Sequence, residues 1–312
     1  MPFRLRLLLF FFNYIIRLDK ETSMTPEAVR ADHKKKMSTF LKLIDFQPIE
    51  MDKVENLQIP VRDGSQIGAR LYRPSNAEKL PLMVFYHGGG FVTRDLDSHD
   101  YACRRIAKTS NVVVLSIDYR LAPEFKFPHP HQDCYDALVW ASEQASELGG
   151  DPDKLIVCGD SAGGNLSTVV SILSRDQKGP KVWKQVLIYP TTDARMGFPS
   201  IKKYSKGYFL TESLMNWFVD HYARTPEDKL DPLMSPYLTD ELSNLPPAYV
   251  CTAEFDPLRD EGEAYAKRLK DAGNTVQFKH FDGMIHGFLN LPKVTRKSTM
   301  QLHEEIAQFI AS

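Results

Sequence analysis

From about residue 56 onward, short apolar runs of strand length alternate with segments of helix length, and this alternation most restricts the folds open to the chain. Some runs are apolar throughout, such as Val112-Val113-Val114-Leu115, as expected for strands covered on both faces. Repeated strand–helix–strand units predict an α/β fold, with a mostly parallel sheet and helices on both sides. The predicted strands are residues 82–86, 112–117, 155–158, 185–189, 248–252 and 276–280.

Two regions depart from the alternation. Residues 56–62 and 66–73 are β-rich and are separated by Asp63-Gly64-Ser65, which predicts an antiparallel hairpin ahead of the parallel units. Between Asp193 and Leu245 the alternation stops and aromatic residues accumulate. We interpret residues 193–245 as an insertion rather than a strand–helix unit of the core.

An apolar run near the amino terminus requires a separate interpretation. Arg4 and Arg6 precede an apolar run over residues 7–16, which is shorter than the roughly 20 residues that span a bilayer and lacks a small-residue cleavage site. Three interpretations stay open for residues 3–18: a helix packed on the protein, a helix that makes weak contact with a membrane surface, or an export signal. A second helix is predicted to begin at Pro26.

Composition excludes several classes of protein. With 43% hydrophobic and 25% charged residues in 312, the chain resembles an ordinary globular protein. Its 39 basic and 40 acidic residues leave a net charge of −1, so we expect no nucleic-acid partner. The four cysteines are widely spaced, which predicts reduced, buried thiols and no metal site. They are Cys103, Cys134, Cys158 and Cys251.

The first chemical motif follows the predicted strand 155–158. Gly159-Asp160-Ser161-Ala162-Gly163 matches the G-x-S-x-G pattern, in which a serine sits on a tight turn between a strand and a helix. The flanking glycines allow close packing there, and the amino terminus of the helix favours developing negative charge. By itself the pattern is modest support, but its position between a strand and a helix strengthens it.

The second motif follows the predicted strand 82–86. His87-Gly88-Gly89-Gly90 is typical of a loop whose backbone amides form half of an oxyanion hole. We expect the amides of Gly88 and Gly89 to donate, together with that of Ala162. A phosphate-binding loop is the alternative, but no Lys-Ser/Thr pair follows the glycines.

An acid and a histidine follow two later strands. Asp256 lies just beyond the predicted strand 248–252, and His286 lies in a loop beyond 276–280. The order Ser161, Asp256, His286 matches the order of triad residues in the α/β-hydrolase fold. Asp256 could instead cap the helix that begins near Pro257, and we expect one aspartate not to serve both roles.

With these motifs the sequence resembles the hormone-sensitive-lipase-like branch of the α/β hydrolases, a family of bacterial esterases marked by HGGG and GDSAG. Residues 119–124, 256–260 and 286–288 agree as well, and the resemblance runs from about residue 50 to the end. It implies Ser161 as nucleophile, Asp256 and His286 as its partners, and His87 as a residue that organises its loop. It also implies carboxylic esters with short or medium acyl chains as substrates, and no metal or cofactor.

The resemblance suggests a division of the chain. We expect residues 51–312 to form the catalytic domain, and residues 1–50 to form a helical cap that the insertion 193–245 completes. The cap would select substrates, although its aromatic side chains could equally pack only on one another. The aromatic residues predicted to contact substrate are Phe91, Tyr208, Phe209 and Trp217.

Several alternatives remain at this stage. The triad would also suit a lipase acting on aggregated lipid, or a hydrolase of aryl esters or small amides, and the fold could serve a ligand-binding protein without activity. We expect a small-molecule ester as partner and a cytoplasmic location, with membrane association or export as the alternatives. A homodimer could form through the predicted edge strand 276–280.

Overall fold

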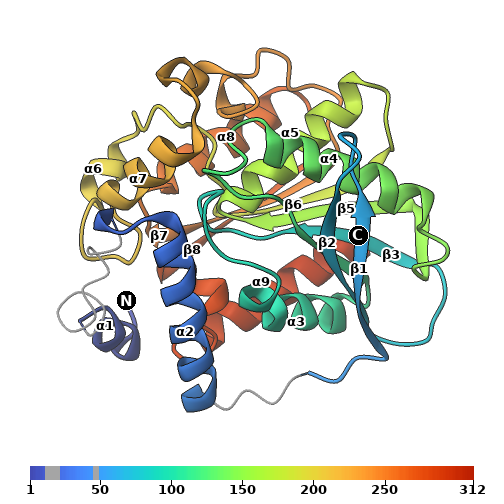
Figure 1. Cartoon of the computed structure of the whole chain (residues 1–312), viewed down its shortest axis with the longest axis horizontal. Coiled ribbons are helices and arrows are strands. Elements are labelled where there is room, and N and C mark those ends of the chain that lie inside the picture. Colours follow the sequence, from blue (N-terminus) through green and yellow to red (C-terminus); the bar gives the residue numbers. More distant parts are fainter. Residues whose placement is uncertain (11–21, 45–48) are drawn as a thin grey trace.

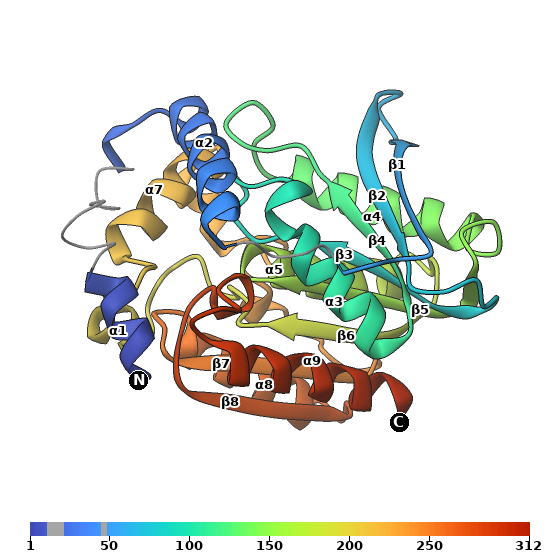
Figure 2. The same cartoon turned by 90° about the horizontal axis from the view of Figure 1, so that it is seen from below.

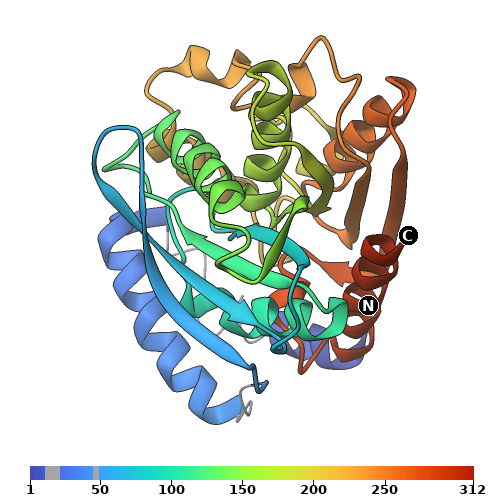
Figure 3. The same cartoon turned by 90° about the vertical axis from the view of Figure 1, so that its right-hand side faces the viewer.

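An eight-stranded sheet forms the centre of the protein in a computed structural model that describes residues 1–10, 22–44 and 49–312. In spatial order the strands run β1-β2-β4-β3-β5-β6-β7-β8. The pairs β1–β2 and β2–β4 are antiparallel and the other neighbours are parallel. Figure 3 shows the β1–β2 hairpin at one edge and β8 at the other. The strands are β1 (Lys53–Pro60), β2 (Gln66–Arg73), β3 (Leu80–Tyr86), β4 (Val113–Asp118), β5 (Gly150–Asp160), β6 (Val182–Ile188), β7 (Ala248–Phe255) and β8 (Val276–Ile285).

Helices cover both faces of the sheet, as Figures 1 and 2 show. One face carries α3 (Asp100–Ser110) and α9 (Arg296–Ala311), and the other carries α4 (His129–Glu143), α5 (Ala162–Asp176) and α8 (Arg259–Asp271). The predicted mostly parallel α/β sheet is therefore confirmed. Short 3₁₀ turns complete the connections, namely η3 (Asp97–His99), η4 (Pro226–Leu230), η5 (Pro236–Leu238) and η6 (Phe288–Asn290).

Strand boundaries differ from the predicted ones where polar residues join the ladder. Strand β2 matches the prediction, but β1 begins at Lys53 because its backbone pairs along the whole of β2, up to Arg73. Strands β5, β7 and β8 extend past their predicted ends by two to five residues, since Asp160 and Glu254 continue the strand conformation. Backbone pairing does not depend on side-chain polarity, so a hydrophobic pattern underestimates such ends.

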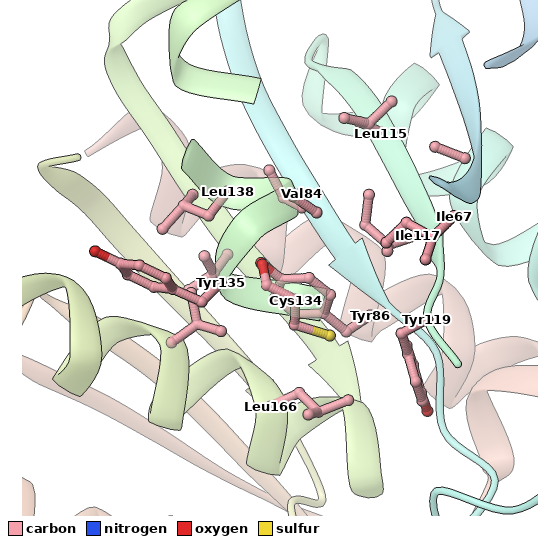
Figure 4. Close-up of a cluster of buried hydrophobic side chains, with 14 of the residues drawn as sticks. Ile67, Val84, Tyr86, Leu115, Ile117, Tyr119, Cys134, Tyr135, Leu138 and Leu166 are labelled. Carbon is pink, nitrogen blue, oxygen red and sulfur yellow. The ribbon is translucent and has the colours of Figure 1, made fainter. Parts of the chain in front are cut away.

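Packing against α4 and α5 fixes the end of β3, as the close-up in Figure 4 shows. The Tyr86 ring is fully buried near Cys134 and Leu166, and its hydroxyl donates a hydrogen bond to the carbonyl oxygen of Cys134 at 2.9 Å. Burial of one such side chain stabilises the fold by roughly 1.5–3 kcal/mol. The loop that follows β3 therefore leaves from a rigid position. All four cysteines are free and buried, as predicted.

The remaining helices gather at the carboxyl ends of the parallel strands, on the left in Figures 1 and 2. They are α1 (Phe3–Phe10), α2 (Pro26–Ile44), α6 (Pro199–Lys203) and α7 (Glu212–Tyr222). The predicted start of a helix at Pro26 is confirmed. Of the apolar run predicted over residues 7–16, only residues 7–10 lie within the described residues. None of the described helices combines the length and the apolarity needed to cross a membrane.

Arg30 ties α2 to the core through hydrogen bonds. The Nε atom of Arg30 donates to the carbonyl oxygen of Val92 at 2.7 Å, and its guanidinium binds the Glu124 carboxylate with two hydrogen bonds of 2.7 and 2.8 Å. Paired hydrogen bonds of this kind fix orientation as well as distance. Helix α2 is thus held over the loops that follow β3 and β4.

Candidate active site

Ser161 occupies the tight turn between β5 and α5. Its backbone has φ 57° and ψ −117°, and its amide donates to the carbonyl oxygen of Ile188 at 2.9 Å. A Cβ atom on Gly163 would overlap the carbonyl oxygen of Tyr86, so only glycine permits this approach of helix to strand. The predicted serine turn is therefore present, with a strained backbone at the serine that its neighbours hold in place.

Three side chains from different strand ends meet in a line. His286 Nε2 lies 2.9 Å from Ser161 Oγ, and His286 Nδ1 lies 2.8 Å from Asp256 Oδ2. Asp256 and His286 are buried, and Ser161 is partly exposed. With Nδ1–H donating to the carboxylate, Nε2 has a free lone pair directed at the serine hydroxyl. The arrangement can take a proton from Ser161 and stabilise the imidazolium that results.

Asp256 serves two purposes at once. While Oδ2 contacts His286, Oδ1 accepts a hydrogen bond from the amide of Leu258 at 2.8 Å, immediately before α8 begins at Arg259. The alternative in which Asp256 caps the helix is not seen, because Leu258 is the N-cap of α8 and no side chain caps it. A carboxylate has two oxygen atoms, and here each has its own partner.

The glycine loop after β3 corrects one predicted oxyanion donor. The amide of Gly88 already donates to Asp160 Oδ1 at 2.8 Å, so it is not available to a developing oxyanion. The amides of Gly89, Gly90 and Ala162 have no acceptor among the residues that the structure describes. Gly90, and not Gly88 as the sequence predicted, thus has an amide without an acceptor in the described part of the chain.

Asp160 and His99 form a supporting pair that the sequence analysis missed. Asp160 is buried beneath the loop, and its Oδ1 lies 3.0 Å from His99 Nε2. Burial alone would raise the pKa of the Asp160 carboxyl, but His99 and the Gly88 amide outweigh burial and lower the pKa below its usual value. The carboxylate is therefore ionised at neutral pH. Asp160 stands inside the serine motif, whereas nothing local marked His99.

His87 organises its own loop. Its Nδ1 lies 2.8 Å from the Gly88 carbonyl oxygen, and its ring stacks on Tyr119 with centroids 4.4 Å apart. The Tyr119 hydroxyl in turn donates to the His87 carbonyl oxygen at 2.7 Å. Burial, with a smaller effect from His99, lowers the pKa of His87 to about 4, so its ring is neutral at physiological pH. These contacts agree with the structural role that the family resemblance implied.

The predicted substrate-contacting aromatics divide into two groups. Phe91 and Trp217 lie in the buried core, where Phe91 stacks on Tyr222 with centroids 4.1 Å apart. Tyr208 and Phe209 lie beside residues that flank Asp256 and His286. Tyr208 stacks on Phe255, the residue before Asp256, and Phe209 lies against Gly287, the residue after His286.

One aromatic contact was not predicted. The partly buried Phe218 of α7 lies against Gly90, where a Cβ atom would come within 2.5 Å of Phe218 Cδ1. Phe218 of the insertion therefore contacts the glycine loop that follows β3.

No group of three His, Cys, Asp or Glu side chains within the described ranges is placed to hold a metal ion.

Comparison with known proteins agrees with this architecture. Residues 83–290 match the family model described as alpha/beta hydrolase fold. The chain is 48% identical to carboxylic ester hydrolase LipN of Mycobacterium tuberculosis over 76% of this chain, which corresponds to 65% of LipN's length. It is 39% identical to an ethyl acetate hydrolase of Pseudomonas putida, over 82% of each chain.

A solved structure resembles the whole chain. The hyperthermophilic esterase from the archaeon Pyrobaculum calidifontis superposes with a TM-score of 0.91 at 42% identity, with all of both chains covered. The similarity to this esterase in sequence thus extends along the whole chain, together with the similarity in fold. This protein belongs to the α/β-hydrolase fold family, in its hormone-sensitive-lipase-like branch.

Proposed function

We propose that this protein is a serine carboxylesterase that hydrolyses small carboxylic esters through an acyl-enzyme. His286 Nε2 takes the proton of Ser161 as Oγ attacks the ester carbonyl carbon. The resulting oxyanion accepts hydrogen bonds from the amides of Gly89, Gly90 and Ala162. Each such donor stabilises the transition state by about 3 kcal/mol. Collapse of this intermediate breaks the ester bond, and the alcohol leaves with the proton from His286.

The second half of the reaction repeats these steps with water. His286 takes a proton from water as its oxygen attacks the acyl carbon, and Ser161 leaves with that proton. The Asp256 carboxylate stabilises the imidazolium form of His286 in both steps. No other group is needed for the atoms and charges to balance.

The observation that carries the proposal is the continuous contact from Asp256 through His286 to Ser161, with distances of 2.8 and 2.9 Å. The named activities of LipN and of the ethyl acetate hydrolase support the same reaction class. Short or medium acyl chains remain our proposal for this chain. A neutral substrate suits a net charge of −1, which provides no electrostatic steering.

We also propose that residues 1–50 and 193–245 act as a cap on a catalytic domain formed by residues 51–312. The position of α2 and α7 at the carboxyl ends of the strands supports this division. Tyr208 and Phe209 are our candidates for substrate contact, ahead of the more deeply buried Phe91 and Trp217.

Location and assembly are part of the proposal as well. Four free, buried thiols are consistent with a reducing compartment such as the cytoplasm. Strand β8 is the last strand of the sheet, and its Phe278 side chain is 39% exposed, so a homodimer through this edge is geometrically feasible.

The nucleophile is tested with Ser161→Ala and p-nitrophenyl butyrate. We expect turnover to fall by at least about 10⁴-fold, because the attacking oxygen is gone. Ser146→Ala is the matched control, since Ser146 is an exposed serine on the loop before β5. Intact-mass analysis should show a fluorophosphonate adduct on the parent protein and none on Ser161→Ala. Parental turnover by Ser161→Ala would exclude the proposed mechanism.

The substrate class is tested with matched esters and amides of increasing acyl length. A carboxylesterase should favour esters of short or medium acids over both long-chain esters and the corresponding amides. Faster turnover of the amides would identify an amidase, and no turnover of any substrate by the parent protein would favour a ligand-binding role.

A further inference from the structure

Helix α1 has apolar side chains on two opposite faces. At about 100° per residue, Leu5 and Leu9 point to one side of the helix, and Phe3, Leu7 and Phe10 point to the other. Leu5 and Leu9 are 0% and 5% exposed, whereas Phe3, Leu7 and Phe10 are 74%, 55% and 58% exposed. The helix therefore packs on the protein through one apolar face and presents a second apolar face at the surface.

The buried face fixes α1 beside the catalytic histidine. Leu5 and Leu9 belong to the same buried cluster as Met284 and Phe288, which lie two residues before and after His286. Met1 also lies beside Gly283, because a Cβ atom there would be 3.4 Å from Met1 Cα. Figure 2 shows α1 at the end of the molecule where β7 and the cap helices lie. Helix α1 thus lies beside the end of β8, next to the segment that carries His286.

Basic residues flank the exposed apolar face. On the same helical projection Arg6 lies about 60° to one side of Phe3, and Arg4 lies about 100° to the other. Both arginines are exposed, and residues 3–10 contain no acidic side chain. An apolar stripe between cations is the pattern of helices that lie at the interface of an anionic lipid layer. The flanking charge favours such a layer over a second copy of this chain, because two copies would bring four arginines together.

We propose that the face of α1 formed by Phe3 and Leu7, with Arg4 and Arg6 beside it, docks the protein on an anionic lipid surface. Docking would bring the Ser161–His286 site next to the membrane, so that the substrates would include esters dissolved in lipid. That consequence rests on the proposed esterase function, whereas docking itself does not. The helix lies on the surface, and its eight residues reach only about 12 Å.

Vesicle binding of the full chain tests the docking face. The parent protein should co-sediment with vesicles of phosphatidylcholine plus phosphatidylglycerol, and less with phosphatidylcholine alone. Phe3→Ser/Leu7→Ser should weaken binding to both by more than about tenfold, because two apolar side chains no longer enter the lipid. Arg4→Gln/Arg6→Gln should weaken binding to the anionic vesicles by about fivefold per arginine and leave binding to phosphatidylcholine unchanged.

Matched controls separate docking from folding and from catalysis. Leu230→Ser removes an equally exposed leucine, 60% exposed on η4, and should bind as the parent does. All these variants should hydrolyse soluble p-nitrophenyl acetate at the parental rate. Ser161→Ala should bind vesicles as the parent does, because docking does not depend on catalysis. If the parent protein bound vesicles but hydrolysed no ester, the esterase proposal would be refuted and the docking proposal would stand.

Two outcomes would overturn the docking proposal. Equal vesicle binding by the parent and by Phe3→Ser/Leu7→Ser would show that this face does not meet lipid. A dimeric parent that fails to bind vesicles and becomes monomeric on the same substitutions would identify the face as a contact between two copies of the chain.

Discussion

Asp160 Oδ1 accepts a hydrogen bond of 2.8 Å from the amide of Gly88, which ties the glycine loop to the residue that directly precedes Ser161. The same oxygen lies 3.0 Å from His99 Nε2, so a buried contact between these two side chains holds the loop from below. There is no room for a side chain at this junction, since a Cβ atom on Gly88 would be 2.8 Å from the Asp160 carbonyl oxygen. The spacing between Ser161 and the next two glycine amides therefore depends on Asp160 and His99.

Replacing His99 should disturb the oxyanion hole without touching the triad. We expect His99→Ala to lower kcat by about tenfold to a hundredfold, because a donor that is worth about 3 kcal/mol loses part of its alignment. KM should change little. Losing His99 also raises the pKa of Asp160, so the acid limb of the kcat profile should move to higher pH. A uniform loss of folded protein, with the pH profile unmoved, would instead indicate a purely structural role.

Gly90 should tolerate no side chain while Phe218 is present. Gly90 has φ +62°, and its Cβ atom would overlap the Phe218 ring. We expect Gly90→Ala to reduce kcat/KM at least about tenfold. The double variant Gly90→Ala/Phe218→Ala should recover most of this kcat/KM, because the overlap is gone. What remains is the strain of the left-handed backbone, about 1–2 kcal/mol.

Gly273→Ala is the matched control for backbone strain. Gly273 has φ +87°, and a Cβ atom there would meet nothing within 4 Å. This variant should lose stability by a similar 1–2 kcal/mol and keep its activity. If adding Phe218→Ala gave Gly90→Ala no recovery, the overlap would not be the cause of its defect.

His303 should weaken the fold as the pH falls. Burial, with a smaller effect from Arg105, lowers its pKa to about 3, and neither ring nitrogen has a hydrogen-bond partner in the described part of the chain. Between its unfolded pKa near 6.5 and this value, the unfolded chain binds more protons, so stability decreases with acid. We expect His303→Leu to gain about 2 kcal/mol over the parent between pH 8 and pH 5, measured by urea unfolding. The exposed His129→Gln should follow the parent at both pH values.

Glu261 should weaken the fold as the pH rises, which is the reverse of the effect of His303. Its side chain is fully buried in α8, and burial raises its pKa to about 8, despite hydrogen bonds from the amides of Thr192 and Asp193. The folded protein then holds a proton that the unfolded chain loses above pH 4.5, so stability decreases as the pH rises toward 8.

Glu261→Gln keeps the acceptor oxygen and removes the ionisation. Relative to the parent it should gain about 2 kcal/mol of unfolding free energy between pH 5 and pH 7, again by urea unfolding. An identical pH dependence in both proteins would mean that Glu261 is ionised in the folded state. The control is Glu263→Gln, which changes an exposed glutamate two positions after Glu261 on the same helix.

The sequence by itself determined the fold class and predicted the three side chains that the structure brings together. Alternating apolar runs predicted the parallel sheet, and ligands bind beyond the strand ends of such sheets, so Ser161, Asp256 and His286 stood out. Each depends on local structure: a turn between strand and helix, or a loop after a strand. The hydrogen bond from the Leu258 amide to Asp256 Oδ1 was not predicted, because it depends on which carboxylate oxygen faces which partner.

Only the tertiary structure decided how these parts are supported. Gly88 and Asp160 are 72 positions apart, and nothing in either motif shows that the first glycine amide is already bound. His99 and Phe218 reach the glycine loop from a different turn and a different helix. For residues 3–18, the sequence left packing on the protein, membrane contact and an export signal as alternatives. In α1, packing of Leu5 and Leu9 leaves Phe3 and Leu7 exposed on the other side. Hydrophobic periodicity reports which face is apolar, whereas the partner of that face is set by contacts between distant segments.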